Sequence, residues 1–190
     1  MAQTPSTMLP LGTAAPDFAL PDVHGKIVTL TDFAKNKALL VAFICNHCPY
    51  VKHIQQKFVT VAAHYQAKGI GVVAINSNDA EKYPDDSPEK MREEAQQLNY
   101  GFSYLFDASQ TVAKAYQAAC TPDFYVFDEH KLLVYRGQFD NARPKNSEPV
   151  TGTDLTTALD ALLASKPVNP DQKPSVGCNI KWKPGNEPNY

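Results

Sequence analysis

Two cysteines separated by two residues are the strongest chemical feature of this sequence. The segment Cys45-Asn-His-Cys48 follows a continuous apolar run and precedes a stretch with helical periodicity. A spacing of three residues is roughly one helical turn, so the two sulfurs can close a small disulfide ring with little backbone movement. At a helix start the unpaired N–H groups and the helix dipole stabilise a thiolate and lower the pKa of a cysteine. The pattern predicts that Cys45 attacks a disulfide and that Cys48 resolves the mixed disulfide.

The neighbours of the pair support this interpretation. His47 lies between the cysteines and offers a positive or hydrogen-bond-donating group to the thiolate. We therefore expect a stronger oxidant than a pair with Gly-Pro between its cysteines. Pro49 follows Cys48 directly and is acceptable only in the first turn of a helix, where its missing N–H is not needed. Pro49 thus independently places the pair at a helix start.

The other two cysteines argue against a zinc site. A structural zinc site usually needs a second cysteine pair at similar spacing, whereas Cys120 and Cys178 are 58 positions apart. We therefore expect no metal, and no cofactor beyond the Cys45–Cys48 disulfide. Cys120 is either a small buried thiol or redox-active. Cys178 is either inert or redox-active, pairing with Cys120 or resolving an oxidised Cys45.

Alternating strands and helices must position the pair. The apolar run 38–44 predicts a buried strand, the apolar spacing from 51 to 65 a helix, and the run 70–75 a second strand. This order is a βαβ unit with parallel strands and a right-handed crossover. Further expected elements are a helix at 87–98, a strand at 103–106, a helix near 110–119, antiparallel strands at 123–128 and 132–136, and a helix opening at 153–154.

Both ends of the chain differ from this core. Short extended pieces at 18–20 and 27–30 flank a turn and predict a small hairpin. Residues 166–190 contain five prolines, which exclude a helix and predict an extended tail. In this tail the alternation around Ile180 and Trp182 predicts that these two side chains press on the body while the lysines face water. We expect a domain at 1–165 and a Pro-rich tail at 166–190 that packs on it.

Composition excludes several classes of protein. The chain has 190 residues, 43% hydrophobic residues, 20% charged residues and a net charge of -2, which indicates a folded globular protein without a basic stripe for nucleic acid. The sequence contains neither a secretory apolar segment nor a membrane span, so we expect a cytoplasmic protein. The acidic residues Asp79, Asp85 and Asp86 are expected to form a solvated loop.

Thr121-Pro122 is the second functional motif. A proline is tolerated at the first residue of a strand, and Pro122 precedes the strand expected at 123–128. This arrangement also resembles thioredoxin-fold proteins, which place a cis-proline before such a strand, facing the Cys-x-x-Cys. The resemblance implies that Thr121 presents its backbone groups to an extended substrate peptide.

The resemblance extends along most of the chain. The segments 15–22, 45–51, 121–125 and 177–182 together resemble a Cys-Asn-His-Cys-Pro subgroup of the peroxiredoxin and redoxin group, the alkyl hydroperoxide reductase/thiol-specific antioxidant superfamily. It implies an α/β thioredoxin fold: a central mixed sheet flanked by helices, with an N-terminal hairpin extension and a C-terminal extended tail.

Two departures from the related families narrow the function. Typical peroxiredoxins carry Pro-x-x-x-Thr/Ser-x-x-Cys, in which the hydroxyl and a separate arginine hold the peroxide, and the sequence upstream of Cys45 lacks this motif. In this chain Arg136 or Arg143 would have to serve as the arginine of a peroxide site. It also lacks the tryptophan and the buried aspartate that precede the first cysteine of thioredoxins. The favoured function is thiol–disulfide exchange, with a peroxiredoxin-like thiol peroxidase and a non-catalytic redox sensor as alternatives. The expected partners are a protein or small-molecule disulfide and an upstream thiol reductant, acting on a monomer or homodimer.

Overall fold

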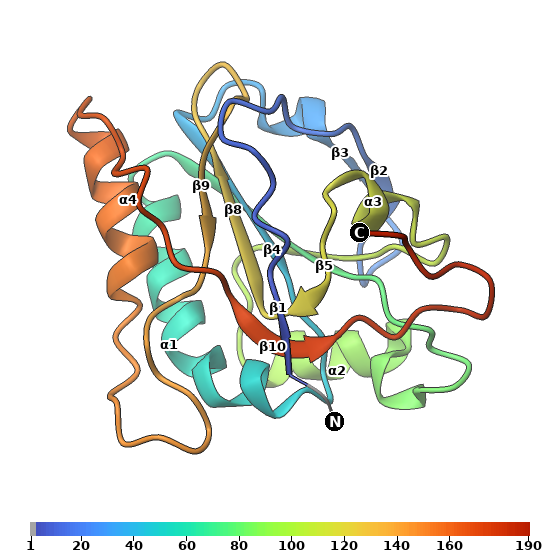
Figure 1. The fold of residues 1–190 in the computed structure, drawn as a ribbon. Coiled ribbons are helices and arrows are strands. Elements are labelled where there is room, and N and C mark those ends of the chain that lie inside the picture. The colour runs from blue at the N-terminus through green and yellow to red at the C-terminus, as the bar shows by residue number, and fades with distance from the viewer. Residues whose placement is uncertain (1–2) are drawn as a thin grey trace.

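A mixed five-stranded sheet forms the centre of the computed structural model, which describes residues 3–190 (Figure 1). Its strand order is β6-β5-β4-β8-β9, with β4, β5 and β6 parallel and β8 and β9 antiparallel to their neighbours. The strands are β4 (Ala38–Phe43), β5 (Ile70–Asn76), β6 (Ser103–Phe106), β8 (Asp123–Phe127) and β9 (Leu133–Gly137). The predicted mixed sheet and βαβ unit are confirmed.

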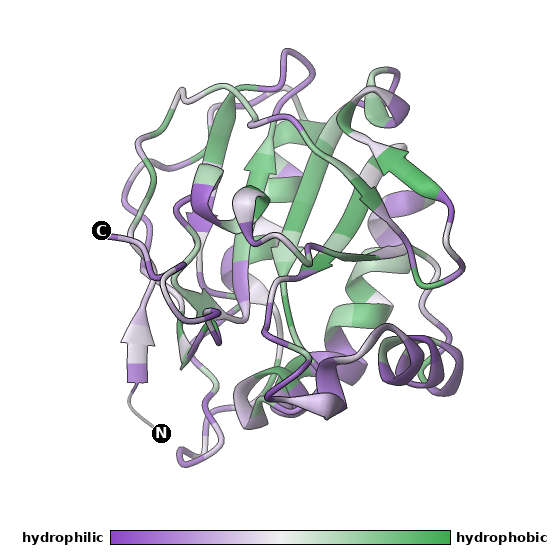
Figure 2. Ribbon diagram, turned by 90° about the vertical axis from the view of Figure 1, so that its right-hand side faces the viewer, coloured by the Kyte–Doolittle hydropathy of each residue, from purple (hydrophilic) through white to green (hydrophobic). Residues whose placement is uncertain are grey.

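Helices cover both faces of this sheet. They are α1 (Pro49–Gln66), α2 (Pro88–Gln97), α3 (Thr111–Ala115) and α4 (Thr153–Leu163), with 3-10 turns η1 (Leu30–Phe33) and η2 (Pro84–Asp86). One face packs on Phe58 of α1 and Leu159 of α4, and the other face packs on Tyr116 after α3. Because both faces are covered, β4 is apolar throughout, as the green central strands of Figure 2 show. No helix between residues 3 and 190 is long and apolar enough to cross a membrane.

The helix expected near 110–119 is shorter than its sequence pattern indicates. It covers Thr111–Ala115, because Gln110 and Gln117 both adopt left-handed backbone angles, with φ of 62° and 49°. A non-glycine residue rarely adopts this region inside a helix. The N-terminal hairpin consists of β2 (Ala19–Pro21) and β3 (Ile27–Thr29), in the predicted place.

The two ends of the chain meet in a second sheet that the sequence pattern did not indicate. Strands β1 (Gln3–Pro5), β10 (Val176–Asn179) and β7 (Cys120–Thr121) pair antiparallel in the order β1-β10-β7. In Figure 1 the blue strand β1 lies against the red strand β10. The tail therefore contains a strand that is hydrogen-bonded to the domain on both of its edges.

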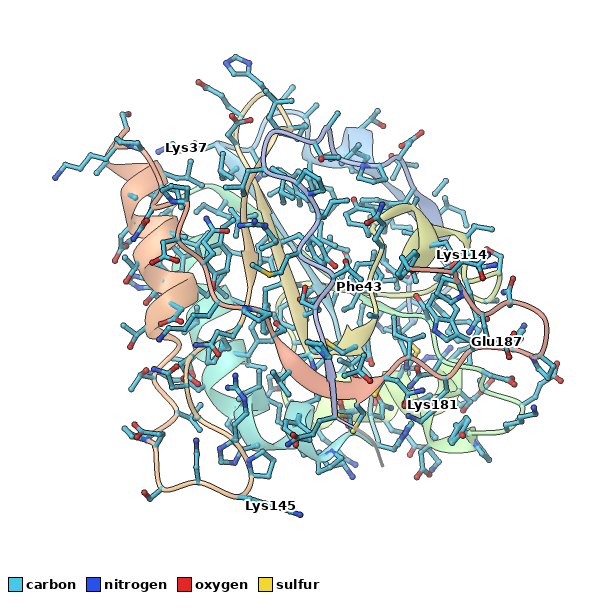
Figure 3. The ribbon with its side chains drawn as sticks, in the orientation of Figure 1. Lys37, Phe43, Lys114, Lys145, Lys181 and Glu187 are labelled. Atoms are coloured by element: carbon cyan, nitrogen blue, oxygen red, sulfur yellow. The ribbon has the colours of Figure 1, made fainter. Side chains whose placement is uncertain are left out.

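Residues beyond β10 anchor the tail further. Ile180 is buried in the apolar cluster that also contains Tyr116, and Trp182 packs against this cluster, as predicted. The expectation that the lysines face water is wrong for Lys181, which is buried just after β10 (Figure 3). Its ammonium donates to the backbone oxygen and to Oδ1 of Asn179, at 2.8 and 3.0 Å, and these hydrogen bonds offset the cost of burial.

Candidate active site

The cysteine pair lies where β4 passes into α1. Cys45 follows the end of β4 by two residues, and Cys48 is the N-cap residue of α1, with Pro49 in its first turn. The predicted helix start is therefore confirmed. Both cysteines are free thiols and are almost completely enclosed, with 1% and 0% of the residue exposed.

Thr121 contacts both sulfurs from the opposite side. Its peptide bond to Pro122 is cis, as the resemblance implied. The Thr121 hydroxyl lies 3.2 Å from Cys45 Sγ, and the Thr121 carbonyl oxygen lies 3.2 Å from Cys48 Sγ. A hydroxyl can donate a hydrogen bond to a thiolate, whereas a carbonyl oxygen accepts one only from a thiol. Thr121 thus offers complementary partners to a charged Cys45 and a protonated Cys48.

Burial and the neighbouring thiols act on the pKa values of both cysteines, and these shifts belong to the pair as a whole. Burial raises the pKa of Cys45 well above its ordinary value, and the nearby Cys48 and Asp86 add to this effect. The nearby Cys45 thiol lowers the pKa of Cys48 against the effect of burial, and the Cys178 thiol adds to this lowering. Cys48 rather than Cys45 also occupies the N-cap, next to the unpaired N–H groups of the helix.

His47 faces a buried aspartate. Its Nδ1 lies 2.6 Å from Asp86 Oδ2, and its ring stacks on Tyr83 with centroids 5.3 Å apart. Lys181 from the tail lies over the Tyr83 ring, with Nζ 5.7 Å from the ring centroid. The histidine predicted to tune the thiolate is therefore held in place by Asp86 and Tyr83.

Asp86 is a buried residue of the candidate site that the sequence did not reveal. Asp86 and Asp79 are buried, which corrects the expectation of a solvated acidic loop, and only Asp85 of the three is exposed. Asp86 accepts hydrogen bonds from Asn46 N at 2.7 Å and Asn78 Nδ2 at 2.8 Å as well as from His47. Burial raises its pKa, but the hydrogen bonds outweigh burial and leave the pKa below its ordinary value. An ionised Asp86 thus ties the Cys-x-x-Cys loop to η2. The hydrophobic pattern of the sequence could not reveal that Asp86 is buried, because Asp86 lies in a short irregular segment without helical or strand periodicity.

Cys45, His47 and Asp86 also bring three potential metal ligands within 4.8 Å of one another. A structural zinc site uses four such ligands. The part of the chain that the structure describes supplies three here, and two of these are already hydrogen-bonded to each other. The arrangement fits a thiol centre better than a closed metal site.

The remaining two cysteines lie in different surroundings. Cys178, on β10, shares the apolar cluster of Cys45 and Cys48 and pairs with Thr121 in the β10–β7 ladder. Cys120 is buried on β7, where its sulfur lies 3.8 Å from the Pro122 carbonyl oxygen. Burial raises the pKa of the Cys178 thiol to about 12 and that of Cys120 well above its ordinary value.

The two arginines considered for a peroxide site bind backbone and amide oxygens. Arg136 donates to the carbonyl of Leu9 and to the side chain of Gln172. Arg143 donates to the carbonyls of Asp140 and Ala142. Neither guanidinium is hydrogen-bonded to Cys45 in the described residues.

Asp123 is a second buried acid, next to Pro122. It accepts hydrogen bonds from Ser6 Oγ at 3.0 Å and from the Tyr125 hydroxyl at 2.9 Å. Burial nevertheless raises its pKa to about 7. An aspartate in this position titrates near neutral pH in the folded protein.

Replacing Asp123 by asparagine is expected to flatten the pH dependence of stability. A raised pKa means that the folded protein holds a proton that unfolded aspartate loses near pH 4, so stability falls as the pH rises from about 4 to 7. The asparagine side chain cannot ionise, and the fall should shrink by up to about 4 kcal/mol. Urea unfolding at pH 4 and pH 8 measures this difference. Parallel pH profiles for the two proteins would contradict the assignment.

Together these features define a class. A mixed sheet flanked by helices, with a Cys-x-x-Cys at a helix start facing a cis-proline, is a thioredoxin fold. The model of the AhpC/TSA family matches residues 11–136, so the chain belongs to the AhpC/TSA family.

The chain is also similar to several known proteins. The chain is 25% identical over 127 residues to the thiol-disulfide oxidoreductase ResA of Geobacillus thermodenitrificans, covering 67% of this chain and 68% of that protein. A crystal structure of an uncharacterized conserved protein from Geobacillus kaustophilus is 56% identical with a TM-score of 0.95, covering 97% of this chain and 98% of that one. A hypothetical protein from Sinorhizobium meliloti is 53% identical with a TM-score of 0.94, covering 96% and 100%.

Proposed function

We propose that this protein is a thiol–disulfide oxidoreductase in which Cys45 and Cys48 form a reversible dithiol/disulfide centre. The observation that carries the proposal is the position of Thr121, whose hydroxyl and carbonyl oxygen each lie 3.2 Å from one of the two sulfurs. The likeness to a thiol-disulfide oxidoreductase adds support. The substrate is a protein or small-molecule disulfide, and a thiol reductant regenerates the dithiol.

The reaction begins when the reduced pair loses one proton. Thr121 favours its loss from Cys45, because the Thr121 hydroxyl can donate to a Cys45 thiolate while the Thr121 carbonyl oxygen accepts from a Cys48 thiol. Cys45 is therefore the thiolate that attacks, and Cys48 keeps its proton until the second step.

Two exchange steps follow. The Cys45 thiolate attacks one sulfur of the substrate disulfide, forms a mixed disulfide and expels one substrate thiolate. Cys48 then loses its proton and attacks Cys45 Sγ, which closes the Cys45–Cys48 disulfide and releases the second substrate thiol. Because both sulfurs are enclosed, a substrate reaches Cys45 only when neighbouring segments shift.

Two assays on the wild-type protein separate this function from its alternatives. Dithiothreitol-driven reduction of insulin, followed by turbidity, is expected to accelerate in the presence of the protein. Consumption of hydrogen peroxide without insulin reduction would instead favour the thiol peroxidase, and neither activity would favour the redox sensor. Insulin reduction no faster than with dithiothreitol alone would overturn the proposal.

Replacing Thr121 by valine is expected to slow exchange about tenfold or more, because a hydrogen bond to a charged group contributes roughly 1.5–3 kcal/mol. Valine keeps the shape of threonine and the backbone carbonyl, so the change removes the hydroxyl next to Cys45. Thr121→Ser is the matched control and should retain most of the rate. The rate of insulin reduction as a function of pH tests this, since the valine variant should also need a higher pH. Equal rates and pH profiles for valine and serine would contradict the role of the hydroxyl.

A further inference from the structure

The edge of β7 next to Pro122 is already paired with a strand of the same chain. Cys178 and Asn179 of β10 pair antiparallel with Thr121 and Cys120. Strand addition at such an edge is the way in which an extended peptide binds through its main chain. The tail therefore occupies the place where Thr121 was expected to present its backbone groups to a substrate.

Gly177 allows β10 to approach this closely. A Cβ atom at Gly177 would lie 1.9 Å from the Thr121 carbonyl oxygen and 2.6 Å from its carbon, which no side chain could tolerate. The backbone of Gly177 therefore rests directly against Thr121. On the far side β1 pairs with β10, and Gln3 Nε2 donates to the Tyr50 hydroxyl at the start of α1 at 2.5 Å. β10 is thus held against the cysteine pair from both edges.

This placement brings a third thiol to the pair. Cys178 follows Gly177, is 2% exposed and lies in the apolar cluster that contains Cys45 and Cys48. Cys178 pairs with Thr121 in the β10–β7 ladder, and the Thr121 carbonyl oxygen lies 3.2 Å from Cys48 Sγ. Thr121 and the shared apolar cluster therefore bring the three cysteines together at one place. Cys120 lies in the next residue pair of the ladder, but its thiol is directed to the Pro122 carbonyl oxygen.

We propose that β10 is a built-in substrate strand and that Cys178 is a third redox thiol, which exchanges with the Cys45–Cys48 disulfide. This inference rests on the proposed function, which supplies that disulfide. The Cys178 thiolate attacks Cys48 Sγ, so that a Cys48–Cys178 bond forms and the Cys45–Cys48 bond breaks. The electron pair leaves on Cys45 Sγ, which takes up the proton that Cys178 lost. One thiol and one disulfide are present before and after, and no external oxidant is consumed.

The exchange gives the disulfide two positions. In one position Cys45 and Cys48 are bonded and the tail thiol is free. In the other position the disulfide ties the tail to the N-terminus of α1, and Cys45 is again a free thiol that can meet another disulfide. The ligand that fits the edge of β7 is therefore an extended strand that contains a cysteine. Residues 176–179 of the chain itself occupy this edge in the structure.

Peptide mapping of the oxidised wild-type protein tests the proposal. Trypsin places Cys45 and Cys48 in peptide 38–52, Cys120 in peptide 115–131 and Cys178 in peptide 146–181. After oxidation with diamide and alkylation at low pH, we expect peptide 38–52 both with an internal disulfide and linked to peptide 146–181. An internal disulfide with Cys178 fully alkylated would overturn this inference and leave the proposed function intact. Absence of any disulfide in peptide 38–52 would overturn both.

The Cys45→Ser variant tests separately whether Cys178 can attack a disulfide at Cys48. In Cys45→Ser, oxidised glutathione should first form a mixed disulfide with Cys48, which Cys178 then displaces to give a Cys48–Cys178 link and reduced glutathione. Cys45→Ser/Cys120→Ser is the matched control and should give the same link. A glutathione adduct that persists on Cys48, with Cys178 still alkylatable, would contradict the proposal.

Discussion

A Cys45→Ser variant is expected to lose thiol–disulfide exchange almost completely, by at least about a hundredfold, as is usual when a nucleophile is removed. A serine hydroxyl does not ionise near neutral pH and cannot form a disulfide. Serine is nearly the same size as cysteine and can still hydrogen-bond to the Thr121 hydroxyl, so the fold should persist. Dithiothreitol-driven insulin reduction measures the loss.

Two other cysteine variants make the result specific. Cys120→Ser is the matched control, because Cys120 is also buried but its thiol faces the Pro122 carbonyl oxygen. It should retain the wild-type rate. Cys48→Ser should lose turnover yet accumulate a mixed disulfide on Cys45, because its resolving thiol has been removed. A Cys45→Ser variant with more than about a tenth of the wild-type rate would contradict the assigned nucleophile.

Replacing Asp86 by alanine is expected to destabilise the protein by about 3–5 kcal/mol, because three hydrogen-bond donors lose a buried carboxylate acceptor. Asp86 is fully buried and accepts from Asn46, His47 and Asn78. Alanine accepts none of these bonds and leaves three donors without their partner in and around the Cys-x-x-Cys loop. Urea unfolding at pH 7 measures the change.

The neighbouring residue provides the control for Asp86. Asp85→Ala removes the same charge from an exposed position one residue away and should change stability by less than about 0.5 kcal/mol. Asp86→Asn keeps the size of the side chain and should lie between the two. Removing this charge should also lower the pKa of Cys45, which Asp86 helps to raise, and so speed its alkylation. Equal stability of Asp86→Ala and Asp85→Ala would contradict the buried role of Asp86.

The sheet and the helix start could be predicted because their signals are local. The apolar runs at 38–44 and 70–75 and the proline after Cys48 each report on a short stretch of chain, and the structure places β4, β5 and α1 there. The place of Thr121-Pro122 opposite the pair came from resemblance, since nothing in the local sequence specifies it.

The rest depends on contacts between distant residues. β1 and β10 are short strands whose partners are remote in sequence, so neither shows a pattern of its own. Asp86 and Asp85 are chemically identical and adjacent, and only the fold decides which one is buried. The pKa of Cys45 was expected to fall because a helix start favours a thiolate, but the fold buries this thiol, and burial raises its pKa.

A redox titration of the wild-type protein shows whether Cys45 and Cys48 form a reversible dithiol/disulfide couple. The protein is equilibrated in buffers of increasing oxidised-to-reduced glutathione ratio, and alkylation of peptide 38–52 is measured by mass spectrometry. We predict that Cys45 and Cys48 become protected together and reversibly, as a two-electron couple. Because His47 lies between the cysteines, where it favours a thiolate and so the reduced form, the midpoint should lie above about -270 mV, the value of thioredoxin. If both cysteines stay alkylatable in the most oxidising buffer, the pair is not a dithiol/disulfide centre and the account is wrong.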